Sequence, residues 1–495
     1  MLATGILLHG FGQRYDLPAA LALYLFAAAG VVIISFVLVA LFAGDQVGAK
    51  AIQYPRRAVP FLLRVAQSPW PRIAGGLVGV LGLAAIIITG IFGSRRPELN
   101  PAEYLTWIYF WAGTVILSGL IGNLWYLLNP WAAIYDAFTR FVRLGPIWKL
   151  PNIGIWPAVV AYFAFACLEL TSGMANRPWI VGAVALAYTA VTLAGMILFG
   201  RDEWLDHCEA FTVLFGIVGR FSPLEAERGA NARITAVYIR PWGVGLLQPS
   251  PTGWDRVMFV ILMLSTLAFD GVEATPAWQN FNITLEPLWL PLGAWGFFAV
   301  KTTGLVLLTG AFLLIFIAFM ELVIYLGKRK VDMKATVTAF ALTLVPIALV
   351  YNAAHNYSYV VVQSQALIPL LNDPLARGWH LFPALAAYKP SFALAQASTV
   401  WFAQIVLIVV GHVIAVYLAH LRAGEPCMSE EKCDETRVDG RIQRPAHVTS
   451  LTPRRDGLGE DPQAGHRVHH HQQQHRVLAQ QGAVGGAEFL AGLQV

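Results

Sequence analysis

Long apolar stretches recur along this chain of 495 residues, and they constrain its fold more than any other feature. Each stretch is about 20 residues long, enough for a helix to cross a hydrocarbon core of about 30 Å. Within that core the backbone polar groups must bond to one another, which helices achieve. The alternating pattern of a membrane β-barrel is absent, and only 13% of residues are charged. The sequence therefore predicts an all-α, polytopic helical membrane bundle.

Nine membrane spans are expected from the positions of the apolar stretches. They lie at about 19–43, 73–93, 104–128, 153–172, 178–200, 257–270, 303–326, 336–360 and 399–420. The sixth is short, so we expect it to extend toward Leu288 or to be partly re-entrant. The chain then divides into a polar N-terminal segment (1–18), the bundle (19–422) and a polar tail (423–495). That tail is either disordered or the product of a frameshift.

The basic residues between the spans predict the orientation in the membrane. The connections at 44–72, 129–152, 201–256 and 327–335 hold 18 Lys and Arg, against 6 in the alternate set. Positively charged connections stay in the cytoplasm. We therefore expect 201–256 to be a cytoplasmic loop, the N-terminus to lie outside, and the protein to be a multi-pass component of a bacterial inner membrane. The net charge of +5 thus serves topology and does not indicate nucleic-acid binding.

Several polar residues gather on the expected outer side of the bundle. The segment "LLHGFGQRYDLP" places His9 and Asp16 just before the first span. Ionisable residues inside spans mark functional sites more often than surface charges do. The others are Glu169, Asp270, Glu273, Tyr351, Asn352, His355 and Tyr359. On one continuous helix the last four share a face, so they would look into the bundle.

Histidine combined with carboxylate is the ligand set of catalytic zinc and related divalent metals. A metal that keeps one position open makes its bound water a nucleophile near neutral pH. No HExxH or HxH spacing supports such a site, so the ligands would come from different spans. The alternatives are a hydrogen-bonded structural role for His355, a loop contact for His9, helix capping or arginine pairing for Asp270, and pairing of Glu169 with Arg177.

Two further groups of titratable residues lie elsewhere. His412 sits inside the last span, where it could join a proton path or a haem ligand set, and His420 lies at the inner end of that span. The stretch "GRDEWLDHCEAF" holds four carboxylates and His207, which we interpret as a solvated helix end. "SPW" and "NPW" predict interfacial tryptophan anchors.

Motifs of several soluble enzyme classes are missing. There is no Walker A loop, no GxSxG elbow and no GxGxxG fingerprint. The four cysteines form no CxxC pair. ATP-driven transport and serine hydrolysis are therefore unsupported.

Four motifs in order carry a resemblance to a known family. "LLHGFGQRYDLP", "LAFDGVEATPAW", "AHNYSYVVVQSQALIPLLNDPLARGW" and "GHVIAVYLAH" resemble bacterial multi-span membrane proteins identified as fenitrothion hydrolases, an organophosphate-degrading activity. The likeness runs from about residue 8 to residue 422. It implies hydrolysis of a small hydrophobic aryl dialkyl phosphorothioate triester that enters from the bilayer and releases a nitrophenol.

Combining the resemblance with the outer polar residues gives a set of expected roles. His9, Asp270 and His355 are candidate ligands of a divalent metal such as zinc. Asp16 or Glu273 would orient a ligand or accept the proton of water, and Asn352 and Tyr359 would line the substrate pocket. Glu169 and His412 are further candidates. The alternative is a non-enzymatic membrane protein, either a transporter or a subunit of a metal or redox system, with room for a partner subunit.

Overall fold

The computed structural model describes residues 54–142, 145–228, 234–248, 250–251, 253–327 and 332–423, with Gly30 and Ile33. Apart from Gly30 and Ile33, the expected first span at 19–43 lies outside the described residues, as do the polar N-terminal segment and the tail beyond Ala423. His9 and Asp16 lie outside them as well.

Within the described part the fold is mostly helical, and five helical segments are long and apolar enough to cross a membrane. They are α3 (Trp70–Phe92), α9 (Pro178–Phe199), α14 (Ala294–Gly327), the run Met333–His355, and α20 (Ala397–Ala423). The run Met333–His355 comprises α15 (Met333–Ala341), η6 (Leu342–Leu344) and α16 (Val345–His355). The chain is accordingly a multi-pass membrane protein.

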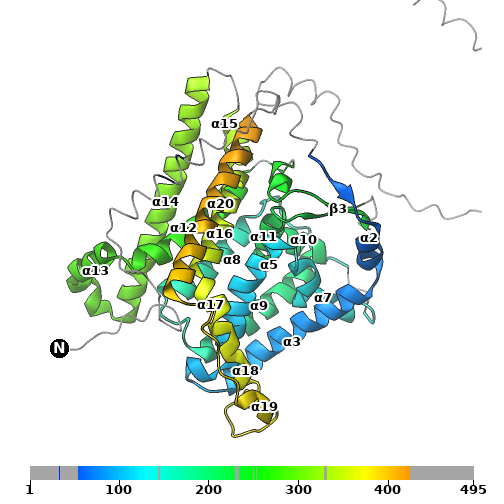
Figure 1. Ribbon diagram of the computed structural model, residues 1–495, viewed down its shortest axis with the longest axis vertical. Coiled ribbons are helices and arrows are strands. Elements are labelled where there is room, and N and C mark those ends of the chain that lie inside the picture. Colours follow the sequence, from blue (N-terminus) through cyan, green and yellow to red (C-terminus); the bar gives the residue numbers. More distant parts are fainter. Residues whose placement is uncertain are drawn as a thin grey trace, which may run out of the picture. The chain divides into compact units, whose positions relative to one another are not determined.

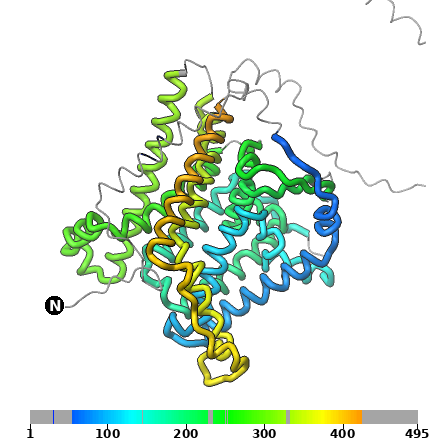
Figure 2. The backbone as a smooth tube through the Cα atoms, viewed as in Figure 1, coloured from blue at the N-terminus to red at the C-terminus, as the bar shows by residue number. Residues whose placement is uncertain are grey.

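A sixth span exists if one bent pair of helices counts as a single crossing. α12 (Trp254–Glu273) and α13 (Pro276–Trp289) meet at 78°. Thr275 caps α13, accepting a hydrogen bond from the Trp278 amide, and Pro276 takes its first position. Figure 2 shows the chain turning there. The sixth stretch is expected to extend toward Leu288 or to be partly re-entrant, and the bent pair is compatible with either.

The remaining expected spans correspond to shorter or interrupted helices. The stretch 104–128 contains a π-helix, η2 (Tyr104–Gly113), then α5 (Thr114–Leu120) and α6 (Trp125–Leu128). The stretch 153–172 contains α8 (Trp156–Ala166) and a second π-helix, η3 (Cys167–Thr171). The total of nine spans and the orientation in the membrane stay predictions.

Other short helices connect these elements. They are α2 (Pro60–Gln67), η1 (Pro97–Leu99), α4 (Pro101–Glu103), α7 (Pro130–Phe138), α10 (Arg201–His207), α11 (Ala210–Gly219), η4 (Val244–Leu247), η5 (Leu290–Leu292), α17 (Tyr357–Val361), η7 (Gln363–Ala366), α18 (Leu367–Leu370) and α19 (Pro383–Ala386). Proline begins many of them because its missing N–H needs no partner in the first turn.

Small residues allow the long helices to approach closely. α16 lies beside α20, and α3 lies beside α9 (Figure 1). A Cβ built on Gly182 of α9 would lie 3.1 Å from the Cα of Gly90 in α3, so backbone meets backbone there. A Cβ built on Gly411 of α20 would lie 2.1 Å from a methyl group of Val350. Such contacts are typical of helix packing in membranes.

Aromatic side chains fill the core between α8, α11 and α12. Phe215 and Phe259 are fully buried, and Phe110 packs edge-on against Phe211 with centroids 4.7 Å apart. In contrast, α14 exposes Leu307, Leu314, Ile315 and Phe319. A buried core combined with an exposed apolar helix face is what contact with lipid requires.

A small sheet departs from the all-α expectation. β1 (Arg57–Ala58), β2 (Leu224–Arg228) and β3 (Ile234–Ile239) form an antiparallel sheet in the order β1-β3-β2, with Leu224 opposite Ile239. The loop 201–256 is thus ordered in its described part. The run "ITAVYI", rich in β-branched residues, carries the strand signal that the expectation missed.

Candidate active site between α12, α14 and α16

The C-terminal end of α12 presents two carboxylates to two different helices. The helix continues through Gly271 and ends after Glu273, so Asp270 and Glu273 stand one turn apart. A Cβ on Gly271 would lie 2.7 Å from the hydroxyl oxygen of Tyr351, so the glycine lets α16 come close. Asp270 therefore faces α16, while Glu273 faces α14.

Asp270 and His355 form an ion pair between α12 and α16. His355 Nε2 contacts Asp270 Oδ2, and only 6% of the Asp270 side chain and 16% of the His355 side chain are exposed. The ring of Tyr351, one turn earlier in α16, stacks on the imidazole with centroids 6.0 Å apart and planes 7° apart. A carboxylate at Nε2 fixes the tautomer with a proton on that nitrogen, which leaves Nδ1 as the basic atom.

Glu273 and Lys301 form a second ion pair, between α12 and α14. Lys301 Nζ lies 2.9 Å from Glu273 Oε2, with 13% and 8% of the two side chains exposed. The ammonium also donates to the backbone carbonyl of Leu170 at 2.6 Å and lies 5.2 Å from the centre of the Phe297 ring. The lysine is thus held by three elements, α12, η3 and α14.

The π-helix η3 forms the third wall of this region. Thr171 Oγ1 and Thr302 Oγ1 share a hydrogen bond of 2.9 Å, which joins η3 to α14 beside Lys301. Glu169 lies in this π-helix and is half-buried. π-helical turns are rare and occur often at functional sites, because they shift side chains and carbonyls out of the regular helical positions.

The charges of the two pairs nearly cancel. Asp270 and Glu273 carry two negative charges and Lys301 one positive charge, so the four side chains sum to zero only when His355 is protonated. Uncompensated charge is expensive at membrane depth. The proton on His355 therefore decides the net charge of the region.

Tyr359 does not stand on one continuous helix with Tyr351, Asn352 and His355, contrary to the expectation. α16 ends at His355, and Asn356 leaves the helical conformation before α17 begins at Tyr357. Tyr359 instead packs near Tyr104 and Leu367. Asn352 is 2% exposed within α16. A shared pocket lining by these two residues finds no support in this arrangement.

The expected metal site is only partly within the described residues. Among them, no group of three His, Cys, Asp or Glu side chains is placed to hold a metal ion. A catalytic zinc needs three protein ligands, and Asp270 and His355 supply two. The third proposed ligand, His9, lies outside the described residues. The described residues alone do not fit a catalytic zinc site.

The other candidate residues lie apart from the two ion pairs. His412 is half-buried in α20, and its Nδ1 lies 2.8 Å from the carbonyl oxygen of Ile408. In the acidic stretch after α9, Asp202 and Glu203 are exposed, as a solvated helix end requires. Glu209 is different, because it is buried and caps α11 through the amides of Phe211 and Thr212.

Lys301 is the residue of the site that the sequence analysis missed. The expected span begins at 303, which assigns the lysine to an outer loop. The structure begins α14 at Ala294, which places the lysine inside the helix. A single lysine within an apolar run, "FFAVKTTGLVLL", was the available signal.

Comparison of the chain with protein-family models, with curated proteins and with solved structures found no match.

Proposed function

We propose that this chain is an integral-membrane hydrolase of neutral aryl dialkyl phosphorothioate triesters such as fenitrothion. The buried Asp270–His355 pair carries the proposal, because it supplies a positioned base at the end of two candidate membrane helices. The substrate class comes from the resemblance of the four motifs to fenitrothion hydrolases. A neutral, apolar triester dissolves in the bilayer and reaches such a site from the lipid.

In the proposed reaction His355 activates water. Its Nδ1 accepts a proton from a water molecule, while Asp270 stabilises the imidazolium through Nε2. The water oxygen bonds to phosphorus, and the bond from phosphorus to the aryl oxygen breaks. The products are a nitrophenolate and a dialkyl thiophosphate. Nitrophenolate is a stable anion, so its departure needs no strong general acid.

Lys301 and Glu273 have supporting roles in this proposal. The Lys301 ammonium lies 2.9 Å from Glu273, one turn along α12 from Asp270, and would offset the negative charge that develops on the thiophosphoryl group. The version of the reaction with a metal-activated water depends on His9 as the third ligand, and it stays a prediction.

The direct test is to add fenitrothion to membranes that contain the full chain and to record the absorbance of released nitrophenolate. His355→Gln should lower the rate at least 100-fold, as for loss of a general base. Asp270→Asn should lower it less and shift the pH optimum. His412→Gln is the matched control, because His412 is a half-buried histidine outside the site. Release of nitrophenol that is equal for all three variants would refute the role of the pair.

A proton-coupled transporter is the second candidate. Ionisable pairs between membrane helices are also typical of proton paths, and the structure has two of them on α12. This function predicts proton flux across proteoliposomes without release of nitrophenol. A metal or redox subunit would instead show a haem or metal absorbance in the purified protein.

A further inference from the structure

Four arginines converge at the opposite end of α12 from Asp270. Arg220 follows α11, Arg240 follows β3, Arg256 lies in the first turn of α12, and Arg422 lies near the end of α20. We refer to these four residues as the arginine cluster. Arg220 and Arg422 each donate one hydrogen bond to a carbonyl oxygen of the short helix η4, and Arg240, Arg256 and Arg422 are close enough to Arg220 to repel its charge.

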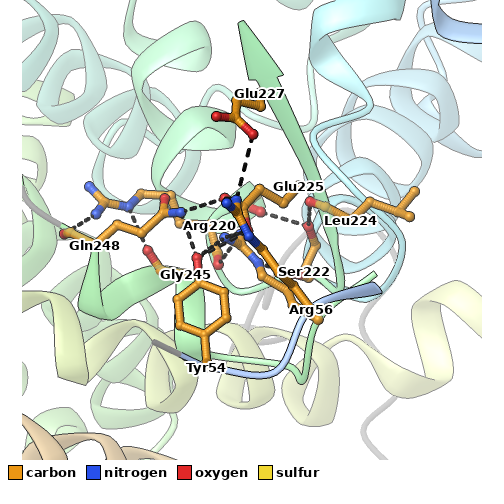
Figure 3. Close-up of polar contacts among 11 residues, drawn as sticks. Tyr54, Arg56, Arg220, Ser222, Leu224, Glu225, Glu227, Gly245 and Gln248 are labelled. Carbon is orange, nitrogen blue, oxygen red and sulfur yellow. Dashed lines mark hydrogen bonds and ion pairs between the residues drawn. The ribbon is translucent and has the colours of Figure 1, made fainter. Parts of the chain in front are cut away.

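Most contacts of the arginine cluster are to neutral carbonyl groups. Arg220 donates to the carbonyl oxygens of Gly245, at 3.1 Å, and Gln248 (Figure 3). Arg240 donates to the carbonyl oxygens of Ser222 and Arg220. Arg422, 8% exposed, donates to a carbonyl oxygen of η4. Carbonyl oxygens satisfy the N–H groups of Arg220 but do not neutralise its positive charge.

Of the carboxylates near the arginine cluster, Glu225 pairs with one member, Arg240, and Asp255 accepts a backbone N–H. Glu225 lies 3.2 Å from Arg56 and 3.1 Å from Arg240 (Figure 3 shows Arg56 and Glu225). Asp255 accepts the backbone N–H of Ile155 at 2.7 Å. In the part of the chain that the structure describes, neither Arg220 nor Arg256 has a carboxylate within 4.0 Å.

The excess positive charge also affects the titration of the cluster. Burial, and then repulsion by Arg422, Arg240 and Arg256, lowers the pKa of Arg220 to about 10. An arginine side chain normally stays protonated at pH values well above 10. A bound anion would relieve this repulsion.

Two exposed tryptophans locate the arginine cluster at the level of lipid headgroups. Trp242 is 52% exposed and follows Arg240 closely in the chain, while Trp254 is 39% exposed and precedes Arg256. Tryptophan side chains favour the membrane–water interface. Basic residues between membrane helices at this level bind phosphate headgroups.

We propose that the arginine cluster binds the phosphate of an anionic phospholipid, with Arg220 and Arg256 as the principal donors. The phosphate would compensate the charge of these two arginines, and the lipid tails would lie along the apolar surface beside Trp242 and Trp254. The site is separate from the Asp270–His355 pair, so it does not depend on the proposed hydrolase activity.

The test measures the thermal unfolding midpoint of the purified full chain in detergent, with added phosphatidylglycerol, phosphatidylcholine or inorganic phosphate. We expect phosphatidylglycerol to raise the midpoint in a saturable way and the other two to have little effect. Arg256→Gln should weaken the apparent affinity about fivefold, as expected for one arginine near the membrane surface. Arg256 makes no hydrogen bond through its side chain among the described contacts, so this variant should fold.

Two further variants complete the test. Arg220→Lys keeps the charge, so it should weaken lipid binding less than Arg256→Gln. Arg96→Gln is the matched control, because Arg96 is an exposed arginine far from η4 in the chain. The proposal is overturned if phosphatidylglycerol has no advantage over phosphatidylcholine, or if Arg256→Gln and Arg96→Gln bind it equally well. It is also overturned if inorganic phosphate stabilises the protein as strongly as the lipid does.

Discussion

The Asp270–His355 pair makes a quantitative prediction about stability that does not depend on any substrate. Both side chains are largely buried, at 6% and 16% exposure, so solvent screens their attraction little. Removing one partner of a buried ion pair typically costs about 3–5 kcal/mol. The two single substitutions should nevertheless differ. His355→Gln removes the ring that contacts the buried Asp270 carboxylate, at a cost of about 3–4 kcal/mol. Asp270→Asn keeps a hydrogen-bond acceptor beside His355, at a cost of about 1–2 kcal/mol.

The double variant separates the pair energy from the effects of each residue. When Asp270→Asn and His355→Gln are combined, the two introduced amide side chains can hydrogen-bond to each other. We expect this double variant to lose about 1–2 kcal/mol, which gives a coupling energy of about 3 kcal/mol. The assay is SDS titration of the protein in detergent micelles, followed by tryptophan fluorescence, with His412→Gln as the control. Additive single effects, or a His355→Gln variant as stable as His412→Gln, would contradict the reasoning.

Three further outcomes are expected. Gly182→Leu should destabilise the α3–α9 contact by at least about 2 kcal/mol in the same titration, because even its Cβ meets the Gly90 backbone, whereas Gly82→Leu, with open space around it, should be neutral. Glu209→Ala should cost about 3 kcal/mol of unfolding free energy, since it removes a buried cap. At Asp373, slight burial is outweighed by backbone N–H donors, which lower its pKa below the ordinary 3.8. The folded state thus favours the Asp373 carboxylate over the protonated acid. Hydrogen-exchange protection of the surrounding loop should therefore hold above pH 3.8 and weaken below it. In Asp373→Asn the protection should not change with pH in this range.

The long helices were largely predictable because the thickness of the bilayer sets the length of the apolar stretches that cross it. Proline and glycine mark the ends of α9, where Pro178 begins the helix and Gly200, with a φ of 96°, follows its last residue. The interruptions were not predictable from apolar length. The π-helices and the break at Asn356 depend on tertiary packing, and the helix propensities of the individual residues do not predict them.

The candidate site was predictable in part. Asp270 and His355 are expected at the same membrane depth, and the structure brings them into contact. Lys301 was missed because the expected span boundary lies nine residues late, at 303 against Ala294. The "NPW" tryptophan, Trp131, is expected at the interface, but it is 4% exposed and donates to Thr189. Its indole N–H finds a partner inside the bundle, which a local motif cannot reveal.

α14 sets the depth of the charged region through the spacing of its own ionisable residues. Lys301 and Glu321 are 20 positions apart, which corresponds to about 30 Å along a helix. This distance matches the thickness of the hydrocarbon core. A helix α14 that runs parallel to the membrane normal would therefore hold the Lys301–Glu273 pair at one boundary of that core. Asp270 then lies about 4.5 Å deeper along α12, and it is enclosed by the protein, because only 6% of its side chain is exposed. A thinner or thicker bilayer would move that boundary relative to the Asp270–His355 pair.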